Sequence, residues 1–121
     1  PDYYHYLELL HYAEGSAITP FLLLLYSRFL GEGSKPLEPR IYSEINNHLG
    51  YLSKVLGNNK YFFRNKFSAS DVMLSFVLEG AMMSRSLEPF SNLKEALKRY
   101  QQREAYKKAI EIGGTYTIGT Q

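Results

Sequence analysis

A short segment in the second half of the chain fixes where one helix begins and indicates where that helix lies. Ser68 and Asp71 have the Ser-x-x-acid spacing of a capping box, in which the hydroxyl accepts from one free N–H and the carboxylate from another. Phe67, directly before the cap, is placed to pack on Val72 one turn inside the helix. Residues 72–83 then carry a single charge, and their apolar side chains fall on every face. Because a helix that is apolar all round is a buried one, the sequence predicts a central helix around which the rest of the chain packs.

Composition excludes several classes of protein. With 121 residues and 45% hydrophobic residues, the chain is long enough for one globular domain, residues 1–121. The absence of cysteine excludes disulfides, a thiol nucleophile and a thiolate metal site. A net charge of +2 is too small to indicate a nucleic-acid or membrane partner. The start of the chain has no signal-peptide pattern, and the longest apolar run, 18–26, is far short of the ~20 residues that cross a bilayer. We therefore expect a cytoplasmic protein.

Helical spacing of the apolar residues predicts an all-α, compact bundle of five helices with no sheet. The expected helices cover residues 3–30, 41–56, 68–85, 93–101 and 103–112. Pro20 lies inside the first of them and crowds the carbonyl of Ser16, so we expect a bend near Gly15. Gly57 is placed to end the second helix, and Asn92, three residues before a glutamate, to cap the fourth.

No motif in the sequence points to a metal or to nucleophilic catalysis. Glu8 and His11 have the spacing of one half of a di-iron site, but such a site needs a second pair and two more carboxylates. Glu44 and His48 are four residues apart and do not supply that pair. The Gly-x-Ser-x-Gly elbow of serine hydrolases is absent, and the basic residues of 94–108 alternate with glutamates as on a solvated helix face.

Four segments, in order along the chain, resemble the C-terminal helical domain of cytosolic glutathione transferases, especially the fungal and bacterial group. They are His11–Ser16 with Pro20, Tyr61–Phe76 around the capping box, Asn92–Arg99, and Arg103–Ala109 with the glycines at 113 and 114. The chain departs from the pattern at Arg64, where the family usually has glycine.

In that family a thioredoxin-like domain precedes the helices, binds glutathione and supplies the catalytic residue. Nothing in this chain alternates strand and helix as that domain would, and the chain starts at Pro1 without an initiator methionine. The resemblance therefore implies the C-terminal half of an enzyme that joins glutathione to apolar electrophiles or reduces peroxides in detoxification. Glutathione would be the co-substrate, held mainly by the other domain, with no metal and no catalytic residue in this half.

Tyr12, Ser16 and Thr19 form a stripe on the first helix that offers one aromatic ring and two hydroxyls beside a proline. Such a stripe suits a pocket that is mostly apolar with a few placed polar groups. The resemblance implies that it belongs to the electrophile site, with Phe76 and Met83 of the buried helix. The alternative is that Tyr12 packs on a neighbouring helix and Ser16 bonds back to a carbonyl.

The start of the first helix carries more aromatic surface than a lone helix would expose. The resemblance implies a homodimer, and we expect Tyr3, Leu7, His11 and Glu14 at its interface. Docking onto the thioredoxin-like domain is the competing explanation. A non-catalytic module that mediates or regulates assembly remains an alternative to an enzyme.

Overall fold

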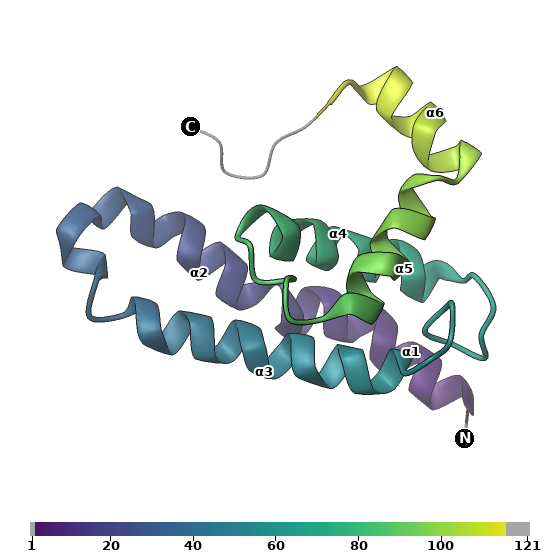
Figure 1. Cartoon of the computed structure of the whole chain (residues 1–121), viewed down its shortest axis with the longest axis horizontal. Helices are drawn as coiled ribbons and strands as arrows, with labels where there is room; N and C mark the ends of the chain where they lie inside the picture. The colour runs from purple at the N-terminus through teal and green to yellow at the C-terminus, as the bar shows by residue number, and fades with distance from the viewer. Residues whose placement is uncertain (1, 116–121) are drawn as a thin grey trace.

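The computed structural model describes residues 2–115 and is built from helices joined by short loops (Figure 1). The elements are α1 (Asp2–Tyr12), the π-helical turn η1 (Ala13–Ala17), α2 (Thr19–Ser27), the 3₁₀ segment η2 (Arg28–Ser34), α3 (Glu38–Leu56), α4 (Ala69–Met83), α5 (Ser91–Gln101) and α6 (Glu104–Gly113). Within 2–115 there is no strand, only an isolated bridge between Phe63 and Lys66. The predicted all-α class is confirmed. The five expected helices are all present, the first of them as α1, η1 and α2 in succession.

The first helix is interrupted where Pro20 led us to expect it. The N–H of Ile18 bonds to the carbonyl of Ala13 at 3.1 Å, which is the i to i+5 pattern of a π turn. Pro20 stands in the first turn of α2, where its missing N–H costs no hydrogen bond. On either side of the turn the helix has different neighbours: α1 packs on α4, and α2 packs on α3.

Helix α3 ends at Gly57 as predicted, with a φ of +55° that favours glycine. The prediction that Asn92 caps α5 is wrong, because Phe90 is the N-cap residue of that helix. Asn92 Nδ2 instead donates to the carbonyls of Ser53, at 2.9 Å, and of Gly57, at 3.1 Å. An amide at the start of α5 thus satisfies carbonyls left open at the end of α3.

The capping box that starts α4 is confirmed. Ser68 is extended, with φ −146° and ψ 175°, and its N–H donates to Asp71 Oδ2 at 3.0 Å. Phe67 contacts the rings of Tyr61 and Tyr100, while Val72, its expected partner, is 55% exposed.

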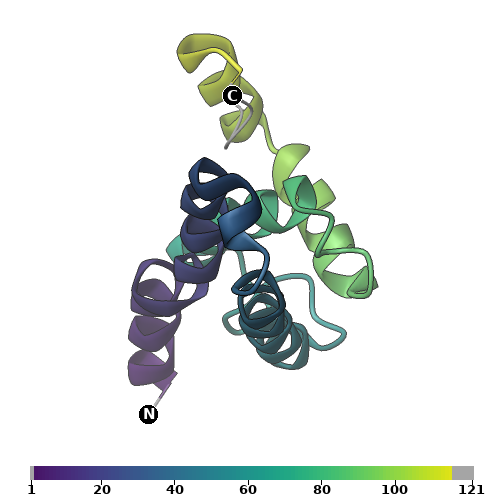
Figure 2. The ribbon, with the colours of Figure 1, turned by 90° about the vertical axis from the view of Figure 1, so that its left-hand side faces the viewer.

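Burial of α4 on every face is not what the structure shows. One side packs against α1, η1 and α5, and it holds the fully buried Leu74, Val77 and Leu78. The other side leaves Val72, Phe76, Met82 and Met83 between 38% and 55% exposed. Helix α6 runs past this side of α4 and does not cover it fully. Helix α6 has no buried residue and stands away from α1, α2 and α3 (Figure 2).

Candidate ligand pockets on the helical bundle

The first-helix pocket lies between η1, α2 and α3 and has a volume of about 280 Å³. Its lining residues are Gly15, Ser16, Thr19, Pro20, Leu23, Glu44 and His48. Two of the predicted site residues, Ser16 and Thr19, therefore line one pocket. The side chain of Ser16 makes no hydrogen bond to another residue within 2–115, so its hydroxyl is open to a ligand.

Tyr12 lies behind this pocket. Its hydroxyl is 2.5 Å from Nδ1 of His48, and its ring meets Tyr51 edge to face at 5.1 Å. Burial raises the pKa of Tyr12 to about 12, with smaller contributions from Tyr51 and Glu8. A neutral phenol of this kind holds the imidazole that forms part of the pocket wall. Tyr12 thus packs on a neighbouring helix, α3, and is not among the lining residues of the pocket.

His48 and Glu44 are pocket residues that sequence reasoning did not assign. They are four residues apart on α3 and so share one face of that helix, which is the signal that could have found them. The spacing of these residues does not predict which helix packs against that face.

The two predicted site residues of α4 lie elsewhere. Met83 lines a different pocket, between α4 and α6, and Phe76 is 38% exposed on the outer face of α4. The structure therefore does not bring all five predicted residues into one site.

The Arg103 pocket, of about 240 Å³, is formed where α4, α5 and α6 meet. Its lining residues are Phe67, Asp71, Val72, Ser75, Tyr100, Arg103, Ala105, Tyr106 and Ala109. The Arg103 guanidinium lies 3.4 Å above the ring of Phe67, a cation–π contact. Asp71 and Tyr100 form a polar pair joined at 2.6 Å. Burial, and then the hydrogen bond to Asp71, raises the pKa of Tyr100 far above the usual value.

The Glu79 pocket, of about 280 Å³, lies on the other side of Tyr106 along the same pair of helices, α4 and α6. Its lining residues are Glu79, Met82, Met83, Gln101, Tyr106, Ile110 and Thr115. The Tyr106 hydroxyl donates to Glu79 Oε1 at 2.6 Å, which ties α6 to α4.

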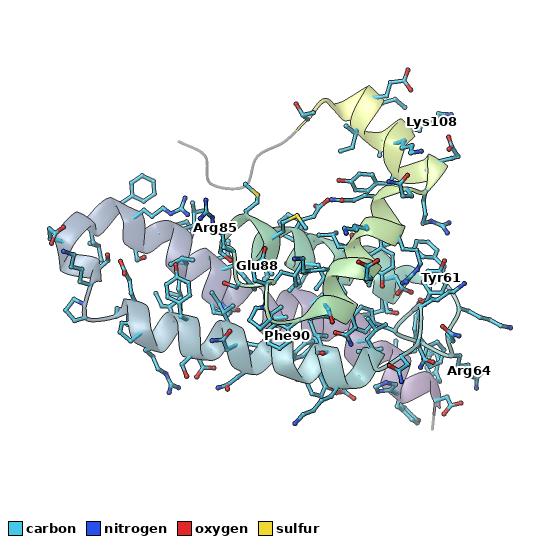
Figure 3. The ribbon with its side chains drawn as sticks, in the orientation of Figure 1. Tyr61, Arg64, Arg85, Glu88, Phe90 and Lys108 are labelled. Atoms are coloured by element: carbon cyan, nitrogen blue, oxygen red, sulfur yellow. The ribbon has the colours of Figure 1, made fainter. Side chains whose placement is uncertain are left out.

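Of the residues predicted for the dimer interface, Tyr3, Leu7 and His11 lie along α1, and Glu14 lies in η1. Tyr3 is 64% exposed, His11 and Glu14 are exposed, and Leu7 is half-buried. The first residue of α1 is tied to the α3–α4 loop, since Arg64 donates to Asp2 Oδ2 at 2.7 Å. Figure 3 shows Arg64 and Tyr61 together in that loop.

Within the described residues there is no group of three or more His, Cys, Asp and Glu side chains that could hold a metal ion. Glu8 accepts from Tyr51 at 2.8 Å and pairs with His5 at 3.5 Å. None of the helices of 2–115 has both the length and the apolar character that crossing a membrane requires.

Comparison with known families places the chain. The family model described as Glutathione S-transferase, C-terminal domain matches residues 18–111, and the protein belongs to that family. Comparisons with curated proteins and with solved structures gave no match. The matched region includes Thr19 and the capping box, whereas α1 and η1, with the predicted dimer residues, precede it.

Proposed function

We propose that this chain is the C-terminal helical half of a glutathione transferase, and that its first-helix pocket forms part of the wall that binds an apolar electrophile. The observation that carries the proposal is the lining of that pocket. Pro20 and Leu23 offer apolar surface, while the hydroxyls of Ser16 and Thr19 are placed to orient a polar group of the ligand.

In the reaction, the sulfur of glutathione attacks the electrophilic carbon as a thiolate, and with an aryl halide the halide leaves. A hydrogen bond from the thioredoxin-like domain would lower the pKa of the thiol and so raise the fraction of thiolate. Glutathione, the co-substrate, would be held mainly by that domain. The part of this chain is to exclude water from the electrophile and to hold it near the sulfur.

The first test is an activity assay of the 121-residue chain with glutathione and 1-chloro-2,4-dinitrobenzene. We expect no turnover above the uncatalysed rate, since the proposal gives this half no group that activates the thiol. Turnover by the chain alone would contradict the assignment of the glutathione site to another domain.

The second test uses the enzyme joined to its thioredoxin-like domain. Ser16→Ala with Thr19→Ala should raise KM for the aryl halide and leave KM for glutathione unchanged, because both hydroxyls face the electrophile side. Ser43→Ala, at an exposed position of α3 outside the pocket lining, is the matched control. An unchanged KM for the aryl halide would remove the first-helix pocket from the proposed site.

A non-catalytic assembly module is the second candidate, and one observation favours it. Phe29 is 85% exposed and Leu30 is 64% exposed at the end of the α2–α3 hairpin, beside Tyr26 and Leu23. Exposed apolar patches of this kind mark interaction surfaces. Apolar electrophiles that leave the melting temperature of the protein unchanged would favour the module over the enzyme.

A further inference from the structure

Glu79 is a nearly buried carboxylate without a cationic partner. The residue is 9% exposed, and its Oε1 accepts from the Tyr106 hydroxyl at 2.6 Å and from Gln101 Nε2 at 3.5 Å. Both donors are neutral. No lysine, arginine or histidine of residues 2–115 pairs with it, and the sequence 116–121 contains none of these residue types. Carboxylates this deeply placed are normally paired, because neutral donors compensate only part of the lost hydration.

The second carboxylate oxygen of Glu79 has no hydrogen-bond donor among the described residues. Oε2 makes no hydrogen bond with a described residue, yet no buried side-chain oxygen or nitrogen in 2–115 lacks a partner. Among residues 2–115, therefore, no donor occupies Oε2. The space next to Glu79 is the Glu79 pocket, so a ligand in that pocket could reach this oxygen.

The walls of the Glu79 pocket are apolar and polarisable. Met82, Met83 and Ile110 supply thioether and alkyl surface, and Tyr106 supplies an aromatic ring. No basic residue is among the lining residues. Arg85, after α4, and Lys108, on the outer side of α6, are exposed side chains outside the lining (Figure 3). Met82 and Met83 are also the last residues of α4, where the helix carbonyls favour positive charge.

We propose that the Glu79 pocket binds an organic ammonium ion, with the nitrogen on Glu79 Oε2 and the apolar substituent against Met82, Met83 and Tyr106. A hard metal ion does not suit the pocket, because it needs several oxygen ligands and Glu79 is the single carboxylate in the lining. An alkyl or aralkyl ammonium suits both parts of the pocket: its charge pairs with the carboxylate, and its carbon skeleton replaces water on the apolar walls. The Tyr106 ring adds a cation–π contact. This site is separate from the first-helix pocket and does not depend on the proposed transferase activity.

The test is a calorimetric titration of the full chain with 2-phenylethylammonium at neutral pH. Its uncharged near-isostere 2-phenylethanol is the matched ligand. We expect the ammonium ion to bind roughly tenfold or more tightly than the alcohol, because the alcohol cannot neutralise the carboxylate. Equal affinities, or no binding of the ammonium ion at about 10 mM, would overturn the proposal.

Variants locate the site. Glu79→Gln keeps the shape of the side chain and an acceptor for the Tyr106 hydroxyl. It should weaken binding of the ammonium ion by about tenfold or more. Glu111→Gln makes the same change of charge at an exposed position of α6 outside the pocket lining, and it should have no effect. Tyr106→Phe keeps the aromatic ring and removes the hydroxyl that donates to the Glu79 carboxylate, so the ammonium ion should still bind. If the folded Glu79→Gln variant binds the ammonium ion with unchanged affinity, the ion binds at a different site.

A readout on the parent protein covers the case in which Glu79→Gln does not fold. The methyl NMR signals of Met82 and Met83 should shift with the ammonium ion and far less with the alcohol at equal concentration. Signals that stay in place while the ammonium ion binds would also exclude this pocket.

Discussion

The carboxylate of Asp71 accepts hydrogen bonds from three parts of the chain. The N–H of Ser68 donates to Oδ2 at 3.0 Å, the N–H of Phe62 to Oδ1 at 3.1 Å, and the Tyr100 hydroxyl to Oδ1 at 2.6 Å. Asp71 is fully buried. This side chain therefore joins the start of α4, the loop before it and the end of α5.

Asp71→Ala should lower the free energy of unfolding by about 3 kcal/mol, more than loss of a cap alone, since it leaves buried donors from three segments without an acceptor. Chemical denaturation followed by circular dichroism measures the loss. Asp2→Ala removes the other aspartate of the chain, an exposed one, and should leave the denaturation midpoint close to that of the parent. A midpoint for Asp71→Ala equal to that of Asp2→Ala would contradict the role of Asp71.

Alkaline pH should destabilise the protein through tyrosines whose pKa values are raised in the folded state. Burial raises the pKa of Tyr12 to about 12, and burial followed by a carboxylate hydrogen bond raises the pKa values of Tyr51, Tyr100 and Tyr106. In the unfolded chain these phenols ionise near pH 10. Between about pH 10 and pH 12 the unfolded state has therefore lost protons that the folded state keeps. Stability is therefore complete below about pH 10 and falls as the pH rises toward about 12.

Denaturant midpoints measured from pH 8 upward check this dependence. Tyr100→Phe, which removes the most buried of these phenols, should flatten the decline above pH 10. A parent midpoint that is constant across the range would show that the folded and unfolded states ionise together.

At the scale of the element, signals within one helix were reliable, and signals that depend on a second helix were not. The start of α4, the end of α3 at Gly57 and the interruption before Pro20 each follow from backbone chemistry within a few residues, and each is confirmed. The sequence predicts that Asn92 caps its own helix, but its amide donates hydrogen bonds to carbonyls at the end of α3. Nothing local to Asn92 distinguishes these two partners.

Gly80→Ala should stabilise α4. Gly80 lies inside the helix, and an added Cβ would be 3.7 Å from the ring of Phe21, an ordinary van der Waals contact. Alanine in place of glycine reduces the entropy of the unfolded chain, so we expect a gain of about 0.5–1 kcal/mol. Thermal unfolding measures it.

Gly57→Ala is the contrasting variant. At a φ of +55° a side chain is strained, and we expect a loss of about 1 kcal/mol or more. A lower melting temperature for Gly80→Ala would mean that Phe21 cannot accept the methyl group.

At the scale of the whole molecule, the fold class and the family followed from the sequence, and the assembly of one site did not. Ser16 and Thr19 share a pocket because they share a helix face, whereas Met83 lines a pocket completed by α6. Whether α4 is covered depends on where α6 comes to lie, and helical periodicity carries no information on that position.

The predicted dimer face on α1 and η1 can be tested on the whole molecule. We expect sedimentation equilibrium to give twice the chain mass, because Tyr3, Leu7, His11 and Glu14 present a mixed aromatic and polar stripe to a second copy. Tyr3→Glu should shift the equilibrium toward the monomer, and Tyr26→Glu, at an exposed position of α2, should not. A strictly monomeric parent at high concentration would leave docking onto the other domain as the explanation of this surface.

The π turn at Ala13–Ala17 holds one residue more than a regular α-helical turn. An additional residue in a regular helix rotates all that follows by about 100°, whereas the wider π turn absorbs the residue and keeps the following helix in phase. Removing Glu14, which is exposed and outside the pocket lining, would therefore restore regular α-helix and leave Thr19 and Leu23 beside His48. A single-codon deletion at Phe21, inside α2, has no such turn to absorb it and would rotate Leu23 out of the pocket.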